Sequence, residues 1–267
     1  MIRPKRVLSL AARVVGLVAA AGALTACDVV VSSMNAQGRA QDEWSKSYPV
    51  APTALLEIVN GNGEIEVTGG AGSTVEVRAE RVARAATDEQ ATEYLKQVEI
   101  EEQVSRDHVR LETKVPPRVH RTWAEVKYHV TVPAGLSVRL RNTNGAVTVV
   151  GVQGEVKAET TNGGVKGREL AGAVEASTTN GGVTLEMTAV AEGGIRAETT
   201  NGGVDLRIPG GAKADIRASV LNGGISLSGL ELEGGQKTRR RVEGRLNGGG
   251  PTVAVETTNG GIKIAAK

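Results

Sequence analysis

Apolar and polar residues alternate with a period of two through much of the second half of this chain. The alternating segments are residues 156–160, 174–178, 183–187, 195–199, 204–208, 216–220 and 225–227. Alternation over four to eight residues is typical of a β-strand that buries one face. The pattern therefore predicts a mainly β protein built from short strands.

Asn-Gly pairs lie between these strands and recur along the chain. They begin at Asn60, Asn144, Asn162, Asn180, Asn201, Asn222, Asn247 and Asn259, and the last seven are separated by 18, 18, 21, 21, 25 and 12 residues. The clearest copy is Glu-Thr-Thr-Asn-Gly-Gly-Val at residues 159–165. This is an internal repeat, and each unit reads as a strand, an Asn-Gly-Gly corner, a second strand and a looser return.

Two architectures fit such a repeat. Asn-Gly between alternating strands is a strong hairpin signal, so an antiparallel meander or sandwich is one of them. A long meander needs a second layer over its apolar face, yet the sequence after Leu136 has no aromatic residue and no convincing amphipathic helix. A solenoid covers its own interior, and a narrow interior explains the alanines at the middle inward position, which are Ala158, Ala176, Ala197 and Ala218. We predict a right-handed parallel β-solenoid in which Thr stacks on Thr and Asn on Asn.

Residues 70–135 interrupt the repeat. Thr87-Asp-Glu-Gln90 is a capping box followed by apolar residues at helical spacing, which predicts one helix of about 10 residues. Alternation predicts strands at 74–82 and 126–132 and a hairpin of 98–104 with 109–115. We interpret this segment as a small α+β insertion that caps a first coil beginning near Ala54, because the open ends of a sheet need cover.

The N-terminus has the pattern of a lipoprotein signal peptide. Arg3, Lys5 and Arg6 precede an apolar stretch, and Leu24-Thr-Ala-Cys27 resembles a bacterial lipobox. We expect diacylglycerol and acyl (palmitate) modification of Cys27 and cleavage before it; an ordinary secretory peptide is the alternative. Cys27 is the sole cysteine, which excludes an intramolecular disulfide. Asp28 favours retention in the inner membrane if the source is Gram-negative, and the sequence does not decide which membrane or leaflet holds the anchor.

The chain thus divides into four parts. They are a signal peptide at 1–26, a lipidated polar tether at 27–53, the first coil with its insertion at 54–135, and the repeat array at 136–267. Residues 1–26 contain four basic and no acidic residues, so 28 Lys and Arg remain against 30 Asp and Glu, a formal charge of about −2. We therefore expect no nucleic-acid partner.

Side chains for catalysis are scarce. From Leu136 onward the aspartates are Asp205 and Asp215, and His, Cys, Trp and Tyr are absent. Glu159 and Glu198 recur singly at one repeat position, which indicates a solvated strand face rather than an acidic cluster. The histidines are His108, His120 and His129, whose spacing matches no metal-ligand pattern. We expect no catalytic residue, cofactor or metal.

One basic cluster falls in the longest gap between repeats. It consists of Lys237, Arg239, Arg240, Arg241 and Arg245. We expect a loop or irregular strand that projects from the array. Its charge fits contact with lipid headgroups, an acidic envelope polymer or a protein.

These features together resemble a known family. The lipobox, the short helix with its hairpin, the Tyr-His-Val-Thr-Val-Pro-Ala-Gly segment at 128–135 and the Thr-Thr-Asn-Gly-Gly-Val units are similar to the DUF4097 family of bacterial β-strand-repeat proteins, called putative adhesins. The resemblance implies a β-solenoid-like extracytoplasmic protein and supplies no catalytic residues. We expect a non-catalytic, lipid-anchored envelope scaffold for multivalent surface interaction. The alternatives are a carbohydrate-active β-helix enzyme and an accessory of envelope-stress sensing; the oligomeric state stays open.

Overall fold

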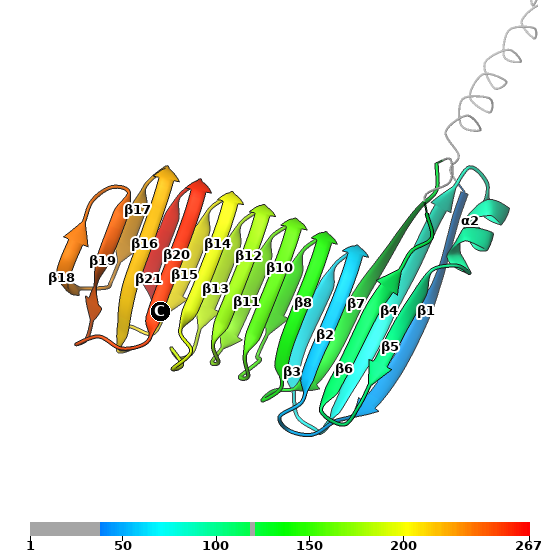
Figure 1. Cartoon of the computed structure of the whole chain (residues 1–267), viewed down its shortest axis with the longest axis horizontal. Helices are drawn as coiled ribbons and strands as arrows, with labels where there is room; N and C mark the ends of the chain where they lie inside the picture. The colour runs from blue at the N-terminus through cyan, green and yellow to red at the C-terminus, as the bar shows by residue number, and fades with distance from the viewer. Residues whose placement is uncertain (1–37, 118–120) are drawn as a thin grey trace, which may run out of the picture. The chain divides into compact units, whose positions relative to one another are not determined.

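The computed structural model describes residues 38–117 and 121–267 of the chain. These residues form two large sheets that lie one in front of the other (Figure 1). The predicted signal peptide, Cys27 and Asp28 lie outside the described residues. The fold is mainly β, with mostly parallel strands in both sheets.

Sheet A has ten strands and sheet B has eleven. In spatial order, sheet A contains β1 (Gly38–Pro49), β4 (Thr74–Ala85), β7 (Trp123–Pro133), β3 (Ile65–Gly70), β9 (Val147–Val150), β11 (Val165–Leu170), β13 (Val183–Met187), β15 (Val204–Ile208), β21 (Ile262–Ala266) and β17 (Ile225–Ser228). Sheet B contains β18 (Leu232–Lys237), β19 (Arg241–Leu246), β16 (Ala214–Asn222), β20 (Thr252–Asn259), β14 (Ile195–Asn201), β12 (Val174–Asn180), β10 (Val156–Asn162), β8 (Ser137–Asn144), β2 (Leu55–Asn62), β6 (His108–Lys114) and β5 (Glu99–Val104).

Each repeat forms one coil, with its first strand in sheet B and its second in sheet A. β10 pairs in parallel with β12, and β11 pairs in parallel with β13, so equivalent residues of successive coils face one another. The alanines at the middle inward position, 158, 176, 197 and 218, are buried, as predicted. The solenoid prediction is confirmed, because the repeat strands pair in parallel and not as an antiparallel meander.

Buried threonines connect the coils near the corners. Thr178 donates its hydroxyl hydrogen to the carbonyl oxygen of Gly163 over 2.8 Å, and Thr199 does the same to Gly181 over 2.8 Å. Their side chains are 6% exposed. A buried hydroxyl must have a partner, because leaving it unpaired costs about 1–3 kcal/mol. Each buried threonine hydroxyl in the repeat therefore finds its hydrogen-bond partner in the neighbouring coil.

The coils do not stack in the order of the sequence. β20 and β21, at the C-terminus, lie between the β14–β15 coil and the β16–β17 coil. The segment before them turns back as β19, which pairs antiparallel with β16. The corner predicted at Asn247 is wrong: this residue has φ 52° and its amide donates to the carbonyl oxygens of Gly210 and Ala212 over 3.0 and 2.8 Å.

The first corner is also displaced from its predicted position. Asn62, rather than Asn60, pairs with Asn144 at the corner, whereas Asn60 pairs with Asn142 at the threonine position. Asn60 is 3% exposed, and its amide donates to the carbonyl oxygen of Val126 over 2.9 Å. Both Asn60-Gly and Asn62-Gly match the corner motif in sequence. Only the register of β2 against β8 shows which of them forms the corner.

Residues 70–135 extend both sheets. β6 pairs in parallel with β2, and β7 with β3, while β5 and β4 add antiparallel strands outside them. The predicted strands, the hairpin and the helix are confirmed. The helix α2 (Asp88–Leu95) begins after Thr87, whose hydroxyl oxygen accepts from the backbone N–H of Gln90.

The predicted polar tether at 27–53 is wrong for its second half. Residues 38–49 form β1, a full edge strand paired antiparallel with β4. Arg81 of β4 fixes this pairing, because its guanidinium donates to both carboxylate oxygens of Asp42 over 2.8 and 2.6 Å. Most β1 side chains are exposed, so the strand lacks the alternation that reveals buried strands.

Candidate functional site

The outward side chains of sheet B form rows, because the coils stack in register. One row holds Thr143, Thr161, Thr179, Thr200 and Thr258, with Leu221 in the last coil. Neighbouring strands lie about 4.8 Å apart, so a row presents the same group at that interval. Adjacent threonines such as Thr178 and Thr179 take opposite faces, one buried and one exposed.

A shallow groove of ≈ 720 Å³ lies on this outer face, over β12, β14, β20 and β16. We call it the hydroxyl groove, and its outward-facing lining residues are Ser177, Thr179, Arg196, Glu198, Thr200, Ser219, Leu221, Glu256 and Thr258. Hydroxyl groups both donate and accept hydrogen bonds, so such a surface suits a polar ligand. The serines were not singled out in the sequence, although the repeat places Ser177 and Ser219 at the position of Glu198.

Two carboxylates lie side by side in the groove. Glu198 of β14 is the register partner of Glu256 of β20. Glu198 is ion-paired with Arg196 of its own strand, whereas Glu256 forms no ion pair with any residue that the structure describes. The groove therefore contains one carboxylate with an ion-pair partner and one without, and hydroxyl groups surround both.

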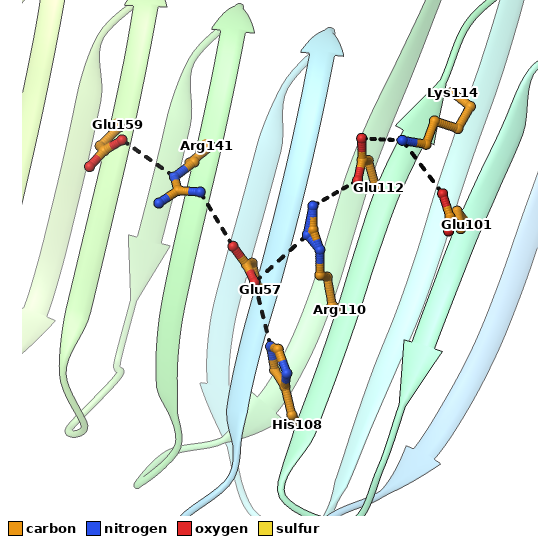
Figure 2. A network of polar contacts seen from close by, with 8 residues as sticks. All are labelled: Glu57, Glu101, His108, Arg110, Glu112, Lys114, Arg141 and Glu159. Atoms are coloured by element: carbon orange, nitrogen blue, oxygen red, sulfur yellow. Dashed lines mark hydrogen bonds and ion pairs between the residues drawn. The ribbon is translucent and has the colours of Figure 1, made fainter.

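A second polar cluster lies on the same face toward the N-terminal end (Figure 2). At its centre is Glu57 of β2, whose side chain is only 10% exposed. Its carboxylate oxygens lie 3.5 Å from His108 Nε2, 3.9 Å from Arg110 Nη1 and 3.5 Å from Arg141 Nη1. A nearly buried carboxylate needs such partners, since an unpaired charge there is costly.

The cluster continues along both neighbouring strands. Arg141 reaches Glu159 over 3.6 Å on one side, and Arg110 reaches Glu112 over 2.7 Å on the other. Lys114 then contacts Glu112 and, over 3.5 Å, Glu101. A hydrogen bond from Lys114 holds the pKa of Glu112 below its usual value, and the same bond raises the pKa of Lys114. Positive and negative groups alternate over five strands, so the network joins neighbouring strands through their side chains.

The recurring glutamates thus differ from the solvated singletons predicted from the sequence. Glu159 is paired with Arg141 and lies 3.3 Å from Lys157, which also bonds Glu175 over 2.9 Å. The hydrogen bond from Lys157 to Glu175 raises the pKa of Lys157. Cross-strand pairing was not visible in the sequence, because it depends on which strands are neighbours.

The basic cluster lies at the far end of sheet B, on the β18–β19 hairpin. Its members Lys237, Arg239, Arg240, Arg241 and Arg245 are all exposed. The segment is an irregular strand, as one form of the prediction had it, with a register shift between Glu233 and Gln236. The predicted projection is wrong, because the carbonyl oxygens of Arg239 and Arg240 accept from the backbone N–H groups of Ile225 and Val220, each over 2.9 Å. The segment therefore pairs with the last coil. Arg241 is bound to Glu243 over 2.6 Å.

The histidines are dispersed. His108 belongs to the Glu57 cluster, and His129 Nδ1 lies 3.1 Å from Glu66 on sheet A. His120 lies outside the described residues. Within 38–117 and 121–267 there is no group of three or more His, Cys, Asp or Glu placed to hold a metal ion. In the same ranges, no helix has both the length and the apolar character for a membrane span.

The fold and the outer surface define the class of protein. It is a β-solenoid-like repeat protein whose polar outward side chains form ion pairs with one another. Residues 56–265 match the family model described as Toastrack DUF4097. The chain therefore belongs to the Toastrack DUF4097 family, as the sequence predicted.

Solved structures give more distant likenesses. One is a "putative cell adhesion protein" from Clostridium sporogenes ATCC 15579, with 16% identity and a TM-score of 0.46 over 85% of this chain and 100% of that chain. Another is a "putative adhesin" from Bacteroides fragilis NCTC 9343, with 12% identity and a TM-score of 0.41 over 85% of this chain and 97% of that chain. No curated protein matches the sequence.

Proposed function

We propose that this protein is a non-catalytic, lipid-anchored scaffold of the bacterial envelope that binds an extended glycan strand in the hydroxyl groove. Residues 1–26 and Cys27 would supply the export signal and the anchor, and residues 70–135 would cap the array at its N-terminal end. The lipobox and its preceding apolar stretch support the anchor.

The observation that carries the binding proposal is the register of the outward rows. Thr179, Thr200 and Thr258 occupy equivalent positions on three neighbouring strands in the groove. A polymer with a repeating unit meets an equivalent hydroxyl at each strand, and individually weak hydrogen bonds add through effective concentration. The groove has no aromatic ring for stacking on sugars, so affinity would depend on the number of contacts.

A matched pair of variants tests this role. Full-length protein in detergent is titrated into fluorescently labelled glycan strands released from bacterial cell walls, with dextran as a second polymer. The T179V/T200V variant should bind about fivefold more weakly or worse, because two hydrogen-bonding groups are lost. The T143V/T161V control changes the same row outside the groove and should bind like the wild type. Equal affinity for all three proteins would contradict the proposal.

The carboxylates of the groove favour a second candidate, hydrolysis of the bound glycan. Glycosidases use two carboxyl groups that flank the scissile bond, and Glu198 and Glu256 are register partners here. New reducing ends are measured after incubation with the same glycan strands. Turnover that Glu256→Gln abolishes would establish the enzyme and overturn the non-catalytic reading, whereas binding without turnover supports the scaffold.

The anchor is tested by Cys27→Ser in a bacterial host. The variant should move from the membrane fraction to the soluble fraction and lose its acyl mass. An unchanged distribution would contradict lipid anchoring.

A further inference from the structure

We propose that copies of this chain associate end to end, with β5 of one copy meeting the β18–β19 hairpin of the next. The two segments are the opposite edges of sheet B. An edge strand has a row of unpaired backbone groups that another chain can use. The inference concerns assembly and does not depend on the glycan proposal.

The two edges carry opposite charges. The six residues of β5 include three exposed glutamates, Glu99, Glu101 and Glu102, and no basic residue. Glu101 lies 3.5 Å from Lys114 of β6 and Glu102 accepts a hydrogen bond from Tyr48, whereas Glu99 forms no ion pair with a described residue. The opposite hairpin carries five exposed basic residues against two glutamates, Glu233 and Glu243, so its net charge is positive. Of the basic residues, only Arg241 forms an ion pair with a residue that the structure describes. Such complementarity steers encounter and fixes which surfaces meet.

An exposed apolar side chain lies on the β5 edge strand, and another lies near the opposite hairpin. Within the described ranges, the large hydrophobic residues that stay exposed are Val104, at 48%, and Leu221, at 62%. Val104 is the last residue of β5. Leu221 lies in β16, next to Val220, whose backbone N–H bonds the carbonyl oxygen of Arg240. Leu221 also lines the hydroxyl groove, and β19 separates its strand from the edge strand β18. A contact between the ends would therefore cover Val104 as well as pairing the charges.

The strand directions permit a continuous sheet. β5 runs antiparallel to β6, which is parallel to the repeat strands. β18 runs antiparallel to β19, which is antiparallel to β16, so β18 has the direction of the repeat strands. Two copies in the same orientation would therefore pair β18 with β5 antiparallel. Different surfaces meet in this contact, so it would produce open chains unless the rotation closes a ring.

Charge reversal tests the contact on full-length protein in detergent. Sedimentation velocity should show concentration-dependent association of the wild type at low salt that weakens at high salt. E99K/E101K and R239E/R240E should each raise the dissociation constant at least tenfold. A mixture of the two variants should recover association, because each reversed end then meets a complementary one.

Controls separate the contact from general effects of charge. E192K/K166E reverses two exposed charges away from both edges and should associate like the wild type, and thermal melts establish that each variant folds. A monomeric wild type at low salt, or a mixture that stays monomeric, would overturn the proposal. It would also fail if anionic vesicles bind the wild type but not R239E/R240E while no self-association occurs, since the hairpin would then be a membrane contact.

Discussion

The side-chain amide of Asn180 donates a hydrogen bond to the side-chain oxygen of Asn162, 2.9 Å away in the neighbouring coil. The same bond recurs between each adjacent pair of corners, at 2.8 to 2.9 Å. In spatial order the ladder contains Asn62, Asn144, Asn162, Asn180, Asn201, Asn259 and Asn222. Every inner asparagine both donates and accepts, so the corners of seven described coils form one chain of hydrogen bonds.

Asn180→Ala should lower the free energy of unfolding by about 1 kcal/mol, because it removes two ladder bonds at an exposed site. Asn222→Ala is the matched comparison and should cost about half as much, since Asn222 is the last member and makes one ladder bond. Urea unfolding measures both. Equal stability of the wild type and the Asn180 variant would show that the ladder contributes nothing.

Gly181→Ala should destabilise the protein by about 2–3 kcal/mol through steric conflict. A Cβ atom at this residue would lie 2.0 Å from the carbonyl oxygen of Gly163 in the next coil. The φ of 156° is also positive, a conformation that residues with a side chain rarely adopt, so backbone strain adds to the close approach. Gly61→Ala is the control, because a Cβ there meets no atom within 4 Å. A neutral Gly181 variant in thermal unfolding would contradict the tight stacking of the corners.

Removal of residues 251–267 should expose strands in the middle of the array rather than at its end. β20 and β21 separate the β14–β15 coil from the β16–β17 coil, and without them both sheets lose a central strand. Hydrogen exchange should show loss of protection in β14 and β16 but not in β2 and β8, several strands away. Unchanged protection in β14 would mean that the remaining coils close the gap.

Acid should weaken the Glu112 network. Hydrogen bonding from Lys114 lowers the pKa of Glu112 in the folded state, so its stabilisation is complete above the usual carboxyl pKa and is lost as pH falls through the lowered value. Glu112→Gln should lower the melting temperature by a few degrees at most at pH 7. The difference from the wild type should shrink as the pH falls below the usual carboxyl pKa and disappear once the pH is below the lowered pKa of Glu112. Glu155→Gln, which removes an exposed carboxylate outside the network, serves as the control.

Much of the fold followed from local pattern. Alternation identified the strands, the capping box at Thr87 identified the single helix of the described residues, and the small inward side chains indicated a narrow interior. These signals depend on a residue and its near neighbours in sequence. They were confirmed because a repeat imposes the same local rule at each coil.

The sequence predicted the candidate site less completely than the fold. Glu159 and Glu198 were visible as outward residues, but the sequence did not show that Arg141 of the neighbouring strand compensates Glu159. Likewise, the basic cluster was visible, but not its pairing with the last coil. Which charges meet across strands depends on spatial neighbours, and these need not be neighbours in sequence.

The sequence by itself determined the period, the inward and outward faces and the small residues at the corners, because side chains alternate along every strand and each coil must bury the same face. Only the tertiary structure decided the order of the coils. Any coil with a matching row of inward residues and a matching corner can pair beside any other, so the C-terminal repeat enters between two earlier ones while Asn247, with the same local motif, stays outside the ladder.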